Sequence, residues 1–175
     1  MKDHLTFLKI IPICFSALIT FVLYPIQASA ETLLGNYNDW DAFTAKENGS
    51  LVCYMGAVPK KSSGKYKKRG QTFLLITHRP RENSANVVSL RPGYTYKSGS
   101  TVEMVIGKST FKLFTVKKWA FAENANIDKN LVQAMIQGRS LTVVGISTRG
   151  TRTTDTYSLR GFTAAYKAIG KACKI

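Results

Sequence analysis

Six cationic side chains within ten residues are the part of this sequence best suited to bind a ligand. They are Lys60, Lys61, Lys65, Lys67, Lys68 and Arg69. The glycine and serines of residues 60–69 (KKSSGKYKKR) predict a mobile loop. Each such cation contributes about 1 kcal/mol of attraction to an anionic membrane surface. The loop therefore predicts an anionic partner: membrane lipid, lipopolysaccharide or a host-surface protein. A solvated loop that only keeps strands from aggregating is the alternative.

Positive charge extends well beyond this loop. The chain has 25 Lys and Arg against 10 Asp and Glu, a net charge of +15. Charge of this size bears on partners and solubility rather than on fold. Nucleic acid, which such a loop would bind with steep salt dependence, ranks below the other partners. The sequence does not determine whether Lys117, Lys118, Arg149 and Arg152 lie beside the loop.

Asp39 and Asp41 are the one carboxylate pair whose spacing suggests catalysis. Residues two apart on a strand point to the same face, and paired carboxylates act as acid and base in glycosidases. A hydrolase acting on an envelope polymer is therefore a minor alternative. The favoured interpretation is a solvated strand face, and Asp155, which lies among threonines, is interpreted in the same way.

Other catalytic and metal-binding patterns are absent from the sequence. It has no G-x-S-x-G, no P-loop and no G-x-G-x-x-G. His78 is the only histidine after residue 30, so a Ser-His-acid set or a metal site has little support. We expect His78 on a strand at the surface. The sequence predicts a protein that is not an enzyme and that uses no metal or cofactor.

Residues 1–30 have the layout of a cleavable signal peptide. Two lysines precede a 17-residue apolar stretch (IIPICFSALITFVLYPI), and Ala28-x-Ala30 supplies the small residues of a cleavage site. Seventeen residues are at the lower limit for crossing a bilayer, so an uncleaved anchor is the alternative. We predict export to the periplasm or the exterior. The mature chain would be residues 31–175, a single domain of net charge +14 with no transmembrane segment.

Two cysteines remain once residues 1–30 are removed, Cys53 and Cys173. In an exported chain, two cysteines predict one disulfide. It would close a loop of about 120 residues, which the chain-entropy model values at roughly 4–5 kcal/mol. Two buried free thiols are the alternative.

Hydrophobic patterning predicts a mainly β protein. Eight segments alternate in polarity or carry the short apolar runs typical of strands. They are residues 51–58, 72–77, 86–90, 101–106, 111–116, 118–121, 140–147 and 153–158. Gly107-Lys108-Ser109 joins the fourth and fifth as a hairpin. Residues 38–43 begin the domain, with Trp40 as a core anchor.

One segment in the second half has apolar residues at helical spacing. Residues 126–137 predict a helix capped at its start by Asn126 or Asp128 and at its end by Gly138.

A second helix is predicted over residues 161–172. Its apolar stripe extends to Cys173, so a disulfide to Cys53 would hold this helix on the sheet. Strands outnumber helices, and the connections resemble hairpins. We predict an antiparallel β-sandwich-like single domain with one or two short helices, the C-terminal one packed on the sheet.

Several stretches together resemble the invasion-associated locus B family of secreted bacterial proteins. The most specific is residues 153–169 (TTDTYSLRGFTAAYKAI), where SLRGFTAA is similar to the family's C-terminal motif. The supporting stretches are Asp39-Trp40, residues 79–93 and residues 131–141, which resemble its opening tryptophan motif, its strand and Pro-Gly turn, and its helix, glycine and strand. The resemblance covers most of residues 38–173.

The resemblance implies an exported protein of a Gram-negative bacterium with a sandwich-like β core and no catalytic residues. Some members are linked to host-cell invasion. Many members place a cysteine pair before the helix, where this chain has Trp119-Ala120-Phe121-Ala122. It therefore resembles a cysteine-poor subgroup with a different disulfide arrangement.

We predict an envelope or extracellular protein without catalytic activity that binds an anionic surface, or a host or envelope partner. The alternative is a periplasmic protein that supports envelope integrity through protein contacts. That role would need exposed apolar surface rather than charge.

Overall fold

Eleven strands and two α-helices make up the described part of the chain. The computed structural model describes residues 31–175, so the predicted signal peptide lies outside the described residues. The strands are β1 (Thr32–Tyr37), β2 (Trp40–Glu47), β3 (Ser50–Ala57), β4 (Lys61–Gly64), β5 (Phe73–Arg79), β6 (Ser84–Arg91), β7 (Thr101–Ile106), β8 (Ser109–Val116), β9 (Trp119–Phe121), β10 (Ser140–Ile146) and β11 (Arg152–Ser158). The helices are α1 (Ala125–Gln137) and α2 (Phe162–Cys173), and a 3-10 turn, η1 (Pro80–Glu82), joins β5 to β6.

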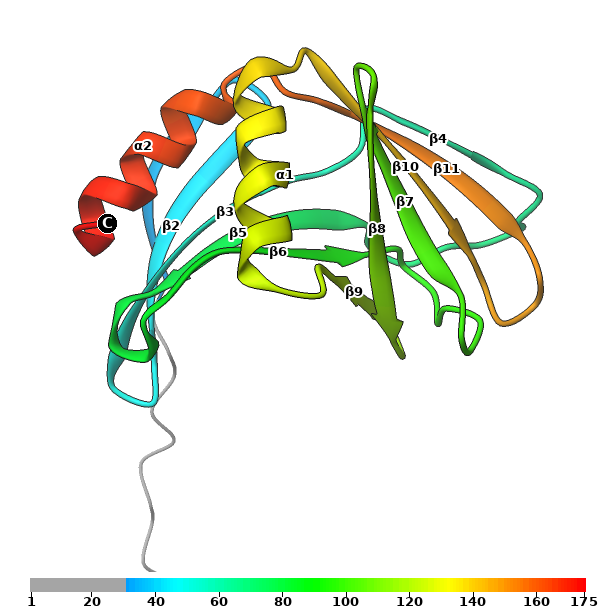
Figure 1. Cartoon of the computed structure of the whole chain (residues 1–175), viewed down its shortest axis with the longest axis horizontal. Helices are drawn as coiled ribbons and strands as arrows, with labels where there is room; N and C mark the ends of the chain where they lie inside the picture. Colours follow the sequence, from blue (N-terminus) through cyan, green and yellow to red (C-terminus); the bar gives the residue numbers. More distant parts are fainter. Residues whose placement is uncertain (1–30) are drawn as a thin grey trace, which may run out of the picture.

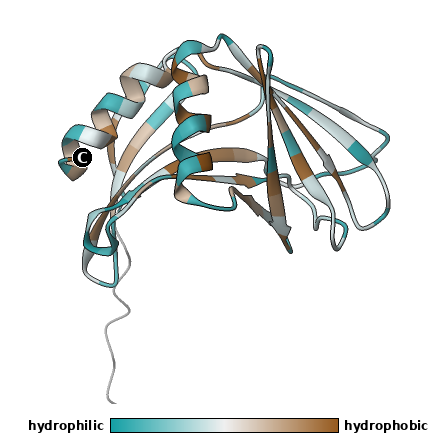
Figure 2. Ribbon diagram, in the orientation of Figure 1, coloured by the Kyte–Doolittle hydropathy of each residue, from teal (hydrophilic) through white to brown (hydrophobic). Residues whose placement is uncertain are grey.

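All eleven strands belong to one antiparallel sheet (Figure 1). Its order is β1-β2-β3-β5-β6-β9-β8-β7-β10-β11-β4. The predicted hairpin is β7–β8, which pairs Thr101 with Phe114 and Ile106 with Ser109. Buried and more exposed residues alternate along β7 and β10, as their hydropathy suggests (Figure 2). The prediction of a mainly β, antiparallel fold is confirmed.

The sheet curves until the turn between β1 and β2 meets the end of β11. The backbone N–H of Asp39 donates to the carbonyl of Arg160 over 3.3 Å. The indole N–H of Trp40 donates to the carbonyl of Ser158 over 3.0 Å. Trp40 is fully buried, which confirms its predicted role as a core anchor. The sandwich-like form therefore arises from one curved sheet.

Both helices pack on the inner face of the sheet, the face that holds the core (Figure 1). Helix α2 contacts β1, β2, β3 and β5, while α1 contacts β6 and β8. The buried helix residues Leu131, Met135, Phe162 and Ile169 join the hydrophobic core. The prediction of a C-terminal helix packed on the sheet is confirmed.

The ends of α1 differ in detail from the predicted caps. The N-cap is Asn124, whose side-chain oxygen accepts the backbone N–H groups two and three residues further on, both over 3.1 Å. Asp128 instead lies buried in the first turn and accepts the backbone N–H of Val88 over 2.9 Å. Gly138 ends the helix in an extended conformation, with φ −82°. Close packing explains this glycine, because a Cβ there would lie 2.7 Å from Ile106 Cγ2.

Three strands, β1, β2 and β4, lie outside the eight segments predicted as strands. Strand β4 occupies part of the segment that was predicted to be a mobile loop. That prediction is wrong for residues 61–64. This Lys-Ser-Ser-Gly segment has no strand pattern of its own. It is a strand because it pairs along β11, for example Ser63 with Thr154, and this pairing satisfies its backbone hydrogen-bonding groups.

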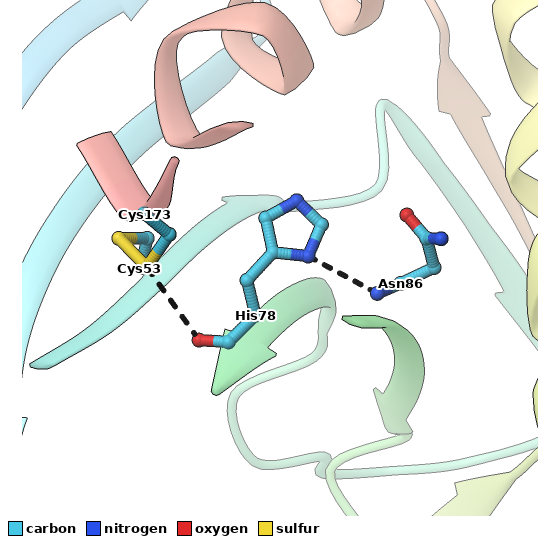
Figure 3. The surroundings of a disulfide bond; sticks show 4 residues. All are labelled: Cys53, His78, Asn86 and Cys173. Atoms are coloured by element: carbon cyan, nitrogen blue, oxygen red, sulfur yellow. Dashed lines mark hydrogen bonds between the residues drawn. A yellow bond between two sulfur atoms is a disulfide. The ribbon is translucent and has the colours of Figure 1, made fainter. Parts of the chain in front are cut away.

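A disulfide joins Cys53 on β3 to Cys173 at the end of α2 (Figure 3). The predicted bond is therefore confirmed. His78 lies beside it on β5, paired in register with Cys53. The prediction that His78 lies at the surface is wrong, because its side chain points to the core face and is fully buried. Its Nδ1 accepts the backbone N–H of Asn86 over 3.1 Å, and burial lowers its pKa.

Candidate anion-binding site

Strand β4 divides the six predicted binding cations between its two ends. Lys60 precedes the strand, and its Nζ lies 2.6 Å from the Asp39 carboxylate. Lys61 is exposed on β4 itself, opposite Thr156 of β11. Lys65, Lys67, Lys68 and Arg69 follow the strand at its other end. The structure therefore does not gather all six cations into one patch.

Arg69 is buried rather than part of a solvated loop. Its guanidinium donates two hydrogen bonds to the Asp155 carboxylate, at 2.6 and 2.5 Å, and a third to the Pro92 carbonyl. The two side chains of the ion pair are only 7% and 4% exposed. The prediction that Asp155 lies on a solvated face is therefore wrong. Burial alone would lower the pKa of Arg69, but its hydrogen bonds to Asp155 outweigh burial and raise it.

Further contacts of Arg69 and of its neighbour Gly70 hold the loop segment around the ion pair in place. The Arg69 guanidinium carbon lies 5.6 Å from the centre of the Tyr66 ring and 5.2 Å from that of Tyr94. One residue further on, the backbone N–H of Gly70 donates to the Gly93 carbonyl over 3.0 Å. The lysines before Arg69 are thus presented from an anchored segment.

A cleft of about 500 Å³ lies between this segment and the turn that joins β10 to β11. It is lined by residues 65–69, by Tyr94 and Thr95, and by Ser147, Thr148, Arg149, Thr151 and Thr153. A shallower hollow of about 700 Å³ continues past Lys65 and Arg149 to Arg152. Among residues 31–175, no acidic side chain lines either hollow. The nearest carboxylate described above, Asp155, is already neutralised by Arg69.

Lys65, Lys67, Lys68, Arg149 and Arg152 together form what we call the cationic cleft. Arg149 and Arg152 are 84 or more residues away from Lys65 in the chain, and β4–β11 pairing brings them together. Lys117 and Lys118 line neither hollow. Sequence reasoning missed Tyr94 and Thr153, whose hydroxyl groups hydrogen-bond over 2.7 Å in the wall of the cleft. Nothing in the local sequence marked them.

Asp39 and Asp41 are not arranged as a catalytic acid and base. Asp39 lies in the turn before β2, so the predicted strand alternation does not apply to it. Hydrogen bonds from Lys60 and then Ser158 lower its pKa, and Arg160 lies 3.6 Å away. Asp39 is therefore held ionised, which is unsuited to a general acid. Asp41 accepts a hydrogen bond from Asn36 over 2.7 Å, and neither aspartate lines the cationic cleft.

The two sequence stretches with the clearest family resemblance meet in space. Trp40 and Phe162 pack edge to face, with ring centroids 4.9 Å apart. Gly161, just before Phe162, has φ +93°, and a Cβ there would lie 1.8 Å from the Tyr37 carbonyl oxygen. Only glycine allows this approach. These motifs thus hold the curved sheet closed at the β1–β2 turn and do not form the cleft.

Two further properties of residues 31–175 bear on function. Within this range, no group of three or more His, Cys, Asp or Glu side chains is placed to hold a metal ion. No helix in the described part of the chain has the length and hydropathy needed to span a membrane.

Comparisons with known proteins agree with the family resemblance. The family model described as invasion associated locus B (IalB) protein matches residues 40–170. Comparison with curated proteins found no match, and neither did comparison with solved structures. The match includes both motifs that meet at Trp40 and Phe162, and it spans well over half of the sequence. This chain belongs to the invasion-associated locus B family.

Proposed function

We propose that this protein is exported, has no catalytic activity and binds anionic groups of the cell envelope or of a host surface in the cationic cleft. Proteins of this family are typically exported and generally non-catalytic. The observation that carries the proposal is the convergence of five cations around two adjoining hollows that no acidic residue of the described chain lines. They are Lys65, Lys67, Lys68, Arg149 and Arg152.

The chemistry of the cleft suits phosphate, sulfate or carboxylate groups. Lysine ammonium groups act as point charges toward such anions, and arginine can donate two parallel hydrogen bonds. The ion pair between Arg69 and Asp155 orders the loop before any ligand arrives, which lowers the entropic cost of binding. Clefts lined by charge of one sign also raise association rates in a salt-dependent way.

The test compares the unchanged protein with a triple variant, Lys65→Gln, Lys67→Gln and Lys68→Gln. The binding affinity of each is measured for a lipid-free polyanion and for lipopolysaccharide. Inorganic polyphosphate immobilised on a sensor surface serves as the lipid-free probe. Three cations worth about 1 kcal/mol each predict a loss of affinity of about 100-fold at low salt. Arg69 stays unsubstituted, because leaving the buried Asp155 without its partner would cost about 3–5 kcal/mol of stability.

The matched control removes the same charge elsewhere. Lys129, Lys167 and Lys171 are exposed on α1 and α2, and their triple change to glutamine should leave binding nearly unaltered. Equal losses for both triple variants would mean that net charge alone attracts polyanions. No loss for the cleft variant would reject the cleft as the binding site.

A further inference from the structure

A strip of aromatic side chains crosses the outer face of four neighbouring strands, β5, β6, β9 and β8. Ring centroids lie 5.7 Å apart between Phe73 and Trp119, 6.2 Å between Trp119 and Phe121, and 6.0 Å between Phe121 and Phe114. Arg91 of β6 lies over Phe73 and Trp119, at 5.7 and 5.9 Å from their centroids. We call these five residues and Val116 the aromatic strip.

The register of the strands places the strip on the face away from the core. Phe121 pairs with Phe114, and Trp119 with Val116, so these side chains share one face. Leu113 and Ala120, which alternate with them, are fully buried on the other face. Both helices cover that inner face. Phe114 is 44% exposed and Val116 is 48% exposed, so both present apolar surface to solvent.

Cations surround one end of the strip. Lys117 and Lys118 form the two-residue turn between β8 and β9, directly beside Val116 and Trp119. Arg91 lies at the same end. Lys112, exposed on β8, continues the outer face beyond Phe114 and pairs in register with Glu103 of β7.

The first residue of this turn, Lys117, has a backbone conformation that is uncommon for lysine. Lys117 has φ +53°, a left-handed conformation that costs most residues about 1 kcal/mol and suits glycine or asparagine. Within residues 31–175, six non-glycine residues have positive φ, and four of them are asparagines. At Lys117 this conformation places a cation at the exposed tip of the β8–β9 hairpin.

We propose that the aromatic strip is a docking surface for an anionic lipid bilayer. Phe114, Val116 and Trp119 would enter the boundary between headgroups and acyl chains, the depth that tryptophan side chains prefer. Lys117, Lys118 and Arg91 would meet the lipid phosphates. Charge complementarity favours this occupant over a second copy of the chain, because two copies would bring two lysine turns and two strongly cationic molecules together.

The test measures co-sedimentation with vesicles of phosphatidylglycerol and phosphatidylcholine, and with phosphatidylcholine alone, using the protein as the cell exports it. The protein should bind the mixed vesicles at least tenfold more tightly than the neutral ones. The chain has two tryptophans, and Trp40 is fully buried. A blue shift of tryptophan emission on vesicle addition therefore reports Trp119.

The strip variant carries Phe114→Thr and Val116→Thr, which keep a strand-forming residue at both exposed positions. It should lose at least tenfold in vesicle affinity, together with the blue shift. The matched control changes Leu51 and Val58, which are 42% and 62% exposed elsewhere on the molecule, to threonine and should bind as the unchanged protein does.

A second variant separates binding from folding. Lys117→Gly should raise the melting temperature while lowering vesicle affinity about fivefold. Lys174→Gly is its matched control, because Lys174 caps α2 with φ +56° and lies away from the strip. This control should also raise the melting temperature, with vesicle affinity unchanged.

The outcomes separate this proposal from that of the cationic cleft. Unchanged vesicle binding by the strip variant, or equal binding to neutral vesicles, overturns the lipid proposal while polyphosphate binding still tests the cleft. A dimer in solution that the strip variant abolishes would also overturn it and would assign the strip to protein contacts. Loss of polyphosphate binding only in the cleft variant, and of vesicle binding only in the strip variant, supports both.

Discussion

At the scale of single residues, the buried polar groups explain most about this protein. Arg69 and Asp155 neutralise each other. They are 86 residues apart in the sequence, so their hydrogen bonds hold the cationic loop against β11. No cation of the described chain forms such an ion pair with Asp128. It accepts one backbone hydrogen bond, from Val88, and burial raises its pKa from 3.8 to about 6.

Asp128 should make the fold less stable as pH rises from about 4 to 6. Below this window the carboxyl is protonated in both the folded and unfolded states. Within the window only the unfolded chain ionises, and above it the folded state bears the full cost of a buried charge, about 3 kcal/mol. Asp128→Asn removes this cost and keeps an oxygen for the Val88 bond. Its free energy of unfolding relative to the unchanged protein should therefore rise by up to about 3 kcal/mol between pH 4 and pH 7, measured by urea denaturation.

The unchanged protein and the Asp128→Asn variant have to be compared at the same pH, because His78 changes stability with pH in the opposite direction. Its lowered pKa means that stability is lost as pH falls below about 6.5, when the unfolded chain takes up a proton that the folded state resists. The contribution of His78 cancels in the comparison. Asp41→Asn, at a half-buried surface position, serves as the control, and a gain at pH 7 no larger than at pH 4 would refute the role assigned to Asp128.

At the scale of elements, pairing with a distant strand determines the conformation and position of the cationic segment. Strand β4 exists through its pairing with β11, and this pairing brings Lys65 to Arg149 and Arg152. Contacts with distant segments also position α2. Phe162 and Ile169 hold it on the sheet through the core, and the disulfide holds its end.

Removing the disulfide should destabilise the protein without unfolding it. The change Cys53→Ala with Cys173→Ala frees a loop of 120 residues, for which chain entropy predicts a loss of roughly 4–5 kcal/mol. Helix α2 should remain docked through its buried aromatic and aliphatic residues, so the circular dichroism spectrum should be retained at 25 °C while the urea midpoint falls. An unchanged midpoint would show that the bond contributes little to stability.

At the scale of the whole molecule, the net positive charge fits the proposed export. An exported chain starting at Glu31 would carry a net charge of +14, and both proposed surfaces, the cationic cleft and the aromatic strip, present lysines outward. The proposed export and the proposed anionic partner are therefore consistent, because acidic envelope polymers and lipids lie outside the cytoplasm.

Intact mass spectrometry of the protein recovered from fractionated cells, without reducing agent, tests this view. The expected mass begins at Glu31 and is two hydrogens short of the free-thiol value, because Cys53 and Cys173 are joined. The fraction that holds the protein then distinguishes periplasm from exterior. A full-length mass in the membrane fraction would instead mean that residues 1–30 act as an anchor.

The sequence by itself determined the features that depend on local pattern. Alternating and apolar runs identified eight of the strands, 3.6-residue spacing identified both helices, and two remaining cysteines identified the disulfide. Family membership was also accessible from the sequence, because Asp39-Trp40 and residues 153–169 are contiguous motifs.

Only the tertiary structure decided the features that depend on pairing between distant segments. Residues 61–64 form a strand, Asp155 is buried against Arg69, and His78 lies in the core. None of these outcomes has a local signal, because a lysine-rich segment, a lone aspartate and a lone histidine have the same pattern whether solvated or paired. The cationic cleft and the aromatic strip are likewise products of register, since strand order sets which side chains become neighbours.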